Sequence, residues 1–388
     1  MKYIVLLIFF VVNILCSHNS FASGWEDIFE SLSYKNTIRP GVQQSTYLYN
    51  AYIRFTVHDN DGIATNFGNT DTVDLFIKST TGNKRLTFSG TKPQLINWAK
   101  ANAQTLLRII FASFPEASFG GATNGQLTTQ QVLSACYGPL ATIRNVDIRV
   151  RGQYDFFELG PRHVKARGSS GMISFSKSFI SGKHTIGVIM PYRYAKSDDK
   201  LDSIMGFFSI MPTYKYHLRL GKNEIEWSIN GSVGAVYLRS DLFPKGSGYI
   251  EYGGGTGLSF IRSFYKRLVG KVGIHYQYTE RDVPDSLVPD ELKWVAKAID
   301  DLDAEQDLTM FGGLSFYIIP KKWYISANAY RIQQLQADIE PDYKYQTVVN
   351  AYMGYDSKHI HIQLGYKTSF EIKDYDDHSI IASLRFTW

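Results

Sequence analysis

The sequence predicts a mainly β protein: a transmembrane antiparallel β-barrel of about 12 strands that follows a small N-terminal α+β region. Three observations predict this fold class. Apolar and polar side chains alternate along repeated segments from residue 143 onward; the chain holds 26 Tyr and 24 Phe, which favour strands; and it holds 32 Gly, which suit turns. A period of two is expected when the two faces of a strand meet different surroundings.

The first 22 residues are organised as an export signal. Lys2 supplies a positive charge, residues 3–12 form an apolar run, and a small-residue site predicts cleavage after Ala22. The apolar run is shorter than the roughly 20 residues that cross a bilayer as a helix, so a retained anchor is the weaker interpretation. A lipid anchor on Cys16 is a minor alternative, because the residues just before it are not small.

We therefore divide the chain into a signal peptide over residues 1–22, an N-terminal α+β domain over residues 23–142 and an outer-membrane barrel over residues 143–388. Cleavage would leave Cys136 as the one cysteine, which excludes an internal disulfide. The loss of Lys2 lowers the net charge from +5 to +4, which is too small to indicate nucleic acid as a partner. No later stretch approaches eighteen uninterrupted apolar residues, which excludes membrane-spanning helices.

Residues 204–220 show the alternation clearly. Phe208, Tyr214 and Leu218 fall on one face, whereas Ser209 and Lys215 fall on the other. The same pattern predicts strands over residues 143–158, 170–180, 183–195, 203–220, 224–240, 247–262, 268–282, 307–319, 322–334, 344–356, 359–372 and 378–388. Short and long connections alternate between them, and in membrane barrels the short turns face the periplasm. Twelve strands would then place both ends of the barrel on the periplasmic side.

A soluble β-sandwich would also alternate, with its apolar face turned inward. Two features favour the membrane instead. Several predicted strands exceed the roughly 5–6 residues typical of soluble sheets. Many apolar faces also end in Tyr or Trp, as expected of the aromatic girdles at the two membrane interfaces. These residues are Tyr192, Tyr194, Trp227, Tyr237, Tyr276, Tyr278, Trp323 and Trp388.

The last eleven residues, HSIIASLRFTW, carry an apolar side chain at every second position and end at Trp388. This run resembles the terminal strand of Gram-negative outer-membrane proteins. The resemblance implies an assembly signal at Phe386 and Trp388 that the barrel-assembly machinery reads, with outer-membrane lipid around the barrel. The predicted architecture also resembles the translocator domain of autotransporters. However, residues 23–142 lack the Gly/Asn-rich repeats that are usual in autotransporter passengers.

The N-terminal region has a different pattern. Residues 47–57, 72–79 and 84–89 are predicted as short strands, and Pro93 favours the first turn of a helix that continues along residues 94–111. A second short helix is expected at residues 126–137. The first helix carries an apolar stripe, composed of Leu95, Trp98, Ala99, Leu106, Ile109, Ile110 and Phe111. We expect the stripe to pack on the region's own sheet; the alternatives are a plug and a helix in the lumen. The region could be periplasmic, a plug or secreted.

Charged side chains of both signs fall on the polar face of the predicted strands and are candidate lumen-lining residues. They are Asp147, Arg149, Arg151, Lys215, Arg219, Glu224, Glu226, Lys271, His275, Arg281, Lys367, Glu371 and Arg385. Such residues either form a network of pairs that rigidifies a narrow barrel or line a selective pore. For Glu224 and Glu226, which lie opposite Lys215 and Arg219 on the neighbouring strand, we predict cross-strand pairing.

No residue pattern identifies a catalytic residue, a cofactor or a metal site, and we predict none of these. Asp377 and His378 suggest the rim chemistry of omptin-type proteases, but omptin barrels have fewer strands and acidic loop tips are common. The acidic segment 283–306 lacks the ligand spacing of a calcium loop.

The predicted function is therefore a non-enzymatic, autotransporter-like outer-membrane barrel that serves transport or surface display. The alternatives are a diffusion channel, or porin, for small solutes and, less favoured, a rim protease or phospholipase. The sequence does not identify the small molecule or passenger that such a barrel would carry.

Overall fold

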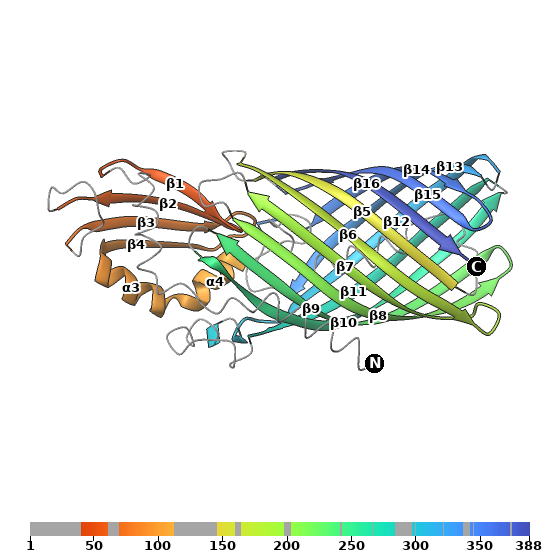
Figure 1. The fold of residues 1–388 in the computed structure, drawn as a ribbon, viewed down its shortest axis with the longest axis horizontal. Helices are drawn as coiled ribbons and strands as arrows, with labels where there is room; N and C mark the ends of the chain where they lie inside the picture. The colour runs from red at the N-terminus through yellow and green to blue at the C-terminus, as the bar shows by residue number, and fades with distance from the viewer. Residues whose placement is uncertain are drawn as a thin grey trace.

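The computed structural model describes residues 40–60, 70–111, 146–159, 164–197, 203–240, 243–265, 267–283, 297–298, 300–320, 322–336, 342–343, 345–372 and 375–388. The described chain forms an N-terminal unit of strands and helices and a barrel (Figure 1). The predicted signal peptide, the helix expected at residues 126–137 and much of the acidic segment 283–306 lie outside the described residues.

The N-terminal unit is a four-stranded antiparallel meander followed by two helices. Its elements are β1 (Gln44–Leu48), β2 (Ala51–His58), β3 (Thr72–Ser79), β4 (Arg85–Thr91), α3 (Lys92–Ala101) and α4 (Ala103–Phe111). The prediction of a single strand over residues 47–57 is wrong. Tyr49 has a left-handed backbone with a φ of 48°, and the chain reverses there into the β1–β2 hairpin. Apolar residues continue on both sides of this turn and are interrupted by Asn50 alone, so the sequence resembles one unbroken strand.

The two helices cover one face of this sheet (Figure 1). Helix α3 begins after Thr91, whose backbone N–H donates to the side chain of Gln94 at 2.9 Å. Leu95, Leu106 and Ile109 from the predicted apolar stripe are buried in one core with side chains of β2 and β3. The prediction that the stripe packs on the region's own sheet is confirmed.

The rest of the described chain contains 12 antiparallel strands that close into a barrel, as the sequence predicts. The strands are β5 (Val146–Leu159), β6 (Val164–Phe179), β7 (His184–Ser197), β8 (Ile204–Leu220), β9 (Asn223–Ser240), β10 (Phe243–Tyr265), β11 (Leu268–Asp282), β12 (Glu305–Ile319), β13 (Trp323–Gln336), β14 (Gln346–Asp356), β15 (Ile360–Phe370) and β16 (Tyr375–Thr387). Each strand pairs with its neighbours in sequence, and β16 closes the ring against β5.

The seam between β5 and β16 extends to the last residue. The backbone N–H of Trp388 donates to the carbonyl oxygen of Val146 at 3.0 Å. From there the register runs from the Asp147–Thr387 pair to the Leu159–Tyr375 pair. The barrel therefore closes at Trp388.

The two ends of the barrel differ. We call the end where β5 begins and β16 ends the turn end, because its hairpins are short; Gly182 and Gly221 have positive φ angles in two of them. We call the opposite end the loop end, because it carries the longest connections, between β11 and β12 and between β13 and β14. Under the orientation usual for membrane barrels, the loop end would face outward from the cell.

Side chains alternate across the barrel wall. On β8, Phe208 is 37% exposed, whereas its neighbour Ser209 is completely buried. Ile229, Leu364 and Ile380 on other strands are also exposed, so the outer face is an apolar surface of the kind that hydrocarbon requires. Among the described residues, no helix is long and apolar enough to cross a membrane.

The N-terminal unit lies against the loop end of the barrel (Figure 1). The backbone N–H of Asp342, in the β13–β14 connection, donates to the carbonyl oxygen of Thr81 at 3.1 Å. The side chain of Gln104 donates to the carbonyl oxygen of Asp301, in the β11–β12 connection, at 3.0 Å. The unit therefore contacts one end of the barrel, although the first barrel strand begins at the other.

Candidate functional site in the barrel lumen

Charged side chains at the turn end pair across β8 and β9, as the sequence predicts. The ammonium of Lys215 lies 3.2 Å from a carboxylate oxygen of Glu226, and Arg219 donates to Glu224 at 3.3 Å. Lys271 on β11 approaches Glu226 at 3.9 Å. Because opposite charges face one another across neighbouring strands, these groups stabilise the wall.

One histidine joins this turn-end group. The Nδ1 atom of His217 lies 3.0 Å from Glu224 and 3.6 Å from Glu226, and a ligand atom from each of the three residues lies within 4.8 Å of the others. Three such groups could hold a metal ion. However, Lys215, Arg219 and Lys271 already contact the same carboxylates, and their positive charges oppose a second cation. We interpret the group as an ion-pair network.

A second network lies inside the wall formed by β5, β7, β15 and β16. The ammonium of Lys367 is 3.3 Å from Asp377, and the guanidinium of Arg193 is 3.9 Å from Asp155. The hydroxyl of Ser379 donates to Asp155 at 2.8 Å and links the two pairs. All five side chains are shielded from water. Buried charges of this kind are retained only when they are paired.

The remaining candidate lumen residues mostly have inward positions. Arg385 pairs with Asp147 at the turn end, and Arg281 pairs with Glu251 at 3.3 Å and with Glu305. Further inward residues are Arg149, Arg151, which donates to Gln153 at 2.5 Å, and His275, whose Nε2 atom lies 3.4 Å from Gln277.

Glu371 departs from the predicted lumen position. Its backbone has a φ of 78°, which ends the alternation of β15. Its carboxylate accepts from Arg331 at 2.8 Å and from the hydroxyl of Thr347 at 2.6 Å. Arg331 is an exposed residue between the buried Tyr330 and Ile332, so the pair lies on the outer face of the wall.

Glycines on the inner face let large side chains lie flat against the wall. A Cβ atom on Gly354 would lie 2.2 Å from the ring of Tyr324, and one on Gly365 would lie 2.1 Å from the ring of Tyr352. Both tyrosines are buried, and the hydroxyl of Tyr324 accepts from Gln363 at 2.6 Å. The rings therefore extend along the wall and not across the lumen.

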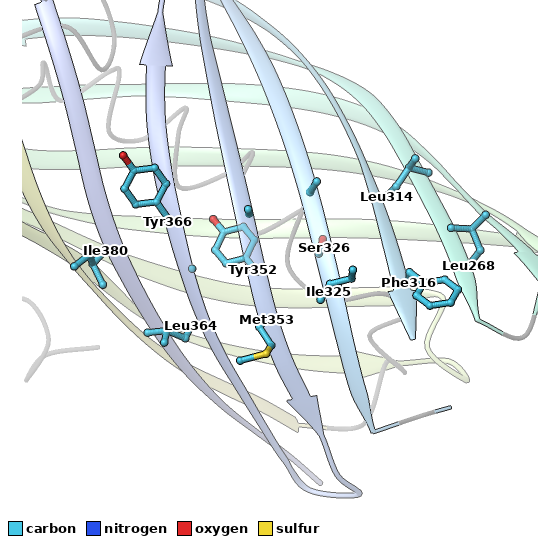
Figure 2. Close-up of a pocket in the computed structure, with 13 residues that line it drawn as sticks. Leu268, Leu314, Phe316, Ile325, Ser326, Tyr352, Met353, Leu364, Tyr366 and Ile380 are labelled. Atoms are coloured by element: carbon cyan, nitrogen blue, oxygen red, sulfur yellow. The ribbon is translucent and has the colours of Figure 1, made fainter. Parts of the chain in front are cut away.

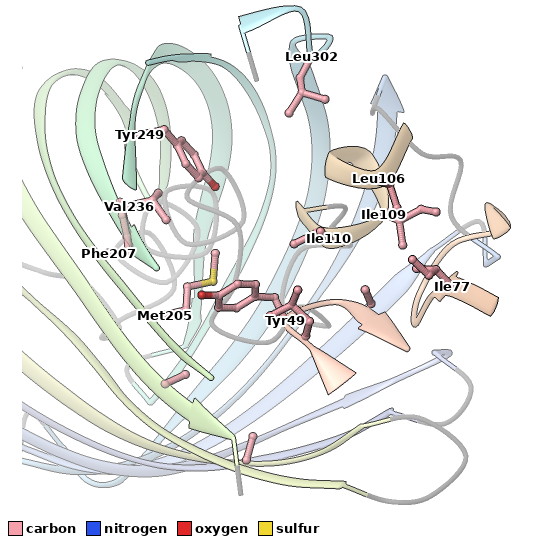
Figure 3. Close-up of a cluster of buried hydrophobic side chains, with 14 of the residues drawn as sticks. Tyr49, Ile77, Leu106, Ile109, Ile110, Met205, Phe207, Val236, Tyr249 and Leu302 are labelled. Carbon is pink, nitrogen blue, oxygen red and sulfur yellow. The ribbon is translucent and has the colours of Figure 1, made fainter. Parts of the chain in front are cut away.

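The inner face at the loop end is apolar, which the sequence analysis missed. Met205 and Phe207 on β8, Val236 on β9 and Tyr249 on β10 are all buried there (Figure 3). In this part of β8 both faces are apolar, so the alternation that identifies the lumen face fades. The run of apolar residues on both faces of this segment was the signal that could have indicated an apolar inner face.

Asp377 and His378 do not form a rim site. Asp377 is buried inside the wall against Lys367, whereas His378 lies on the outer face, where its Nδ1 atom is 2.6 Å from the hydroxyl of Tyr366. Adjacent residues of a strand point to opposite faces, so these two side chains cannot act on one substrate.

The outer wall carries a shallow apolar groove over β11 to β16, with a volume of about 750 Å³ (Figure 2). Ala327 and Ala351 line its middle, and the larger Leu314, Met353 and Leu364 stand around them. The three larger side chains are exposed, so the groove opens outward from the barrel and not into the lumen.

A closed antiparallel ring with an apolar outer face, a polar inner face and short hairpins at one end is an outer-membrane β-barrel. No protein-family model matches the chain, and no curated protein matches its sequence.

Among solved structures, the chain is similar to the translocator domain of the autotransporter NalP from Neisseria meningitidis, with a TM-score of 0.46, 13% identity and coverage of 67% of this chain and 95% of that one. For the transport unit of the autotransporter AIDA-I from Escherichia coli, the TM-score is 0.45 and the identity 11%, with coverage of 68% of this chain and 98% of that one. For an outer membrane channel from Pseudomonas putida F1, the TM-score is 0.45 and the identity 10%, with coverage of 64% of this chain and 97% of that one.

Proposed function

We propose that this protein is a surface-display barrel, which carries its own N-terminal unit at the loop end. One observation supports this function above the others. Helix α4 ends at Phe111 in the unit that contacts the loop end, whereas β5 begins at Val146 at the turn end. Residues 112–145 therefore connect opposite ends of the barrel. A periplasmic domain that simply precedes a barrel would lie at the turn end.

The connection has enough length for this path. Its 34 residues can span up to about 110–120 Å when extended, whereas the 14 residues of β5 span about 46 Å along the strand.

The proposal includes two partners. Outer-membrane lipid would cover the exposed apolar wall, and its acyl chains match the lining of the groove around Ala327 and Ala351. The barrel-assembly machinery would recognise the terminal strand, which ends at Phe386 and Trp388. The paired lumen charges and the occupied loop end favour display over diffusion of small solutes, and no residue arrangement described above supports an enzyme.

The test is thiol labelling on intact cells in a Cys136→Ser background. Thr87→Cys places a thiol on an exposed position of β4, and Lys358→Cys places one in an exposed turn-end hairpin. A membrane-impermeant maleimide should label Thr87→Cys directly and Lys358→Cys only after the outer membrane is permeabilised. Labelling of Lys358→Cys together with protection of Thr87→Cys on intact cells would reverse the orientation and exclude surface display.

A further inference from the structure

One apolar cluster continues from the N-terminal unit into the mouth of the barrel (Figure 3). Tyr49 and Ile110 lie at the end of the unit that faces the barrel, and Met205 and Phe207 belong to the inner face of β8. Figure 3 shows Tyr49 pointing toward the inner rim at Met205. All four side chains are buried.

The position of this cluster needs an explanation, because the inner face of a water-filled barrel is polar. The turn-end part of the same wall follows that rule, with Lys215 and Glu226 facing the lumen. Near the loop end, β8 to β10 instead present apolar side chains inward and keep them from water. An apolar inner rim is stable when something apolar covers it, and Tyr49 and Ile110 contribute to that cover.

Polar contacts hold the unit in place around this cluster. Arg108 lies 3.7 Å from Asp303 in the β11–β12 connection, and Lys78 lies 3.6 Å from Asp342 in the β13–β14 connection. Leu302, next to Asp303, joins the apolar cluster. Contacts to two separate connections fix the unit's orientation over the mouth.

We propose that the N-terminal unit is a stopper that closes the loop-end mouth of its own barrel. The apolar rim on β8 to β10 is its seat, and the Arg108–Asp303 and Lys78–Asp342 pairs are the clamps that hold it there. This inference goes beyond display, because it gives the displayed unit an effect on the permeability of the barrel. It does not depend on which side of the membrane the loop end faces.

The test measures access to the seat in detergent-purified full-length protein. Met205→Cys in a Cys136→Ser background places the only thiol of the chain, apart from Cys16 of the export signal, beneath the stopper. A hydrophilic maleimide should label this thiol slowly in the parent. Reversing both clamp cations, with Lys78→Glu and Arg108→Glu, should increase the labelling rate at least tenfold.

Restoring the pairs with Asp342→Lys and Asp303→Arg should return the rate toward the parent value. The matched control is Arg54→Glu with Lys100→Glu, which makes the same charge change at exposed positions of the unit outside the contacts with Asp303 and Asp342. The control should leave the rate unchanged. Heat-modifiable migration on a gel verifies that each barrel is folded, and Val236→Cys repeats the measurement at a second position of the rim.

Rapid labelling in the parent, or equal rates in the parent and the clamp-reversed variant at both rim positions, would overturn the proposal. Because the measurement is made in micelles, it is insensitive to membrane orientation. Protection of Thr87→Cys on cells would therefore contradict the display function and leave the stopper proposal intact. Labelling of Thr87→Cys on cells together with rapid labelling of Met205→Cys in the parent would support display and contradict the stopper.

Discussion

The ammonium of Lys367 lies 3.3 Å from the carboxylate of Asp377, and both side chains are completely buried within the barrel. The sequence alone does not indicate this pair, because the two residues come together only through the antiparallel register of β15 and β16. This pair provides the most direct test of the view that the lumen charges are structural.

Breaking the Lys367–Asp377 pair from one side should be costly. Lys367→Met should destabilise the barrel by about 3–5 kcal/mol, because it leaves the Asp377 carboxylate buried without its cation. The double variant Lys367→Met with Asp377→Leu should recover much of this loss. Urea unfolding of the purified barrel measures the single variants Lys367→Met and Asp377→Leu and the double variant, and additive losses in the double variant would contradict a direct interaction.

The glycine under Tyr324 should not tolerate a side chain. Gly354→Ala places a Cβ atom 2.2 Å from the tyrosine ring and should cost about 1–3 kcal/mol, because the ring must move from its place on the wall. Gly152→Ala is the matched control, since a Cβ atom there meets nothing within 4 Å. Adding Tyr324→Ala to Gly354→Ala should remove most of the penalty specific to Gly354. Equal stability of the two glycine variants would contradict the prediction.

The stability of the N-terminal unit should depend on pH through Asp74. The hydroxyl of Ser89 and the imidazole of His58, which is 2.8 Å away, hold the pKa of Asp74 below its usual value of 3.8. A carboxyl group whose pKa is lowered by folding stabilises the fold above its unfolded pKa, and this contribution is lost as the pH falls through the folded pKa.

Asp74→Asn should therefore lower the melting temperature of the unit near pH 7 and have little effect near pH 2. The effect at neutral pH should stay below about 1 kcal/mol, because both partners are about half exposed. The helical circular dichroism signal follows the unit, because α3 and α4 supply nearly all of the helix in the residues that the structure describes. If Asp74→Asn lowered the melting temperature equally at both pH values, the ionised carboxylate of Asp74 would not be the source of the stabilisation.

Trp388 should be needed for assembly more than for contacts in the finished barrel. Trp388→Ala should lower the amount of folded protein in the outer membrane severalfold, because it removes the terminal aromatic residue and an interfacial anchor. Ile318→Ala removes a similarly exposed apolar side chain elsewhere on the outer wall and should have a small effect. Heat-modifiable migration quantifies both variants, and equal losses would contradict a specific role for the terminus.

Much of the barrel could be predicted from the sequence because a wall with lipid on one side and polar groups on the other imposes a period of two. The pairing of Lys215 with Glu226 followed from the same argument, since a short hairpin sets the register of β8 and β9. The apolar stripe with Leu106 and Ile109 followed from helical spacing.

The features that the sequence did not predict depend on contacts between distant residues. Tyr49 sits in a reversal with no Gly or Pro, where Asn50 is the single turn-forming residue, so local composition gave a weak signal for the β1–β2 turn. Glu371 left the lumen face because one left-handed residue changes the parity of a strand. Met205 and Phe207 broke the alternation, and the buried cluster that they share with Tyr49 and Ile110 joins residues far apart in the sequence.

The seam between β5 and β16 also restricts how the protein can be shortened. Its two strands are the first and last of the barrel, so every residue pair in it joins segments more than 200 positions apart. A nascent or truncated chain that lacks β16 leaves β5 and β15 as open strand edges, which are sites for aggregation. Loss of β16 should therefore remove folded barrel altogether and not yield a smaller one.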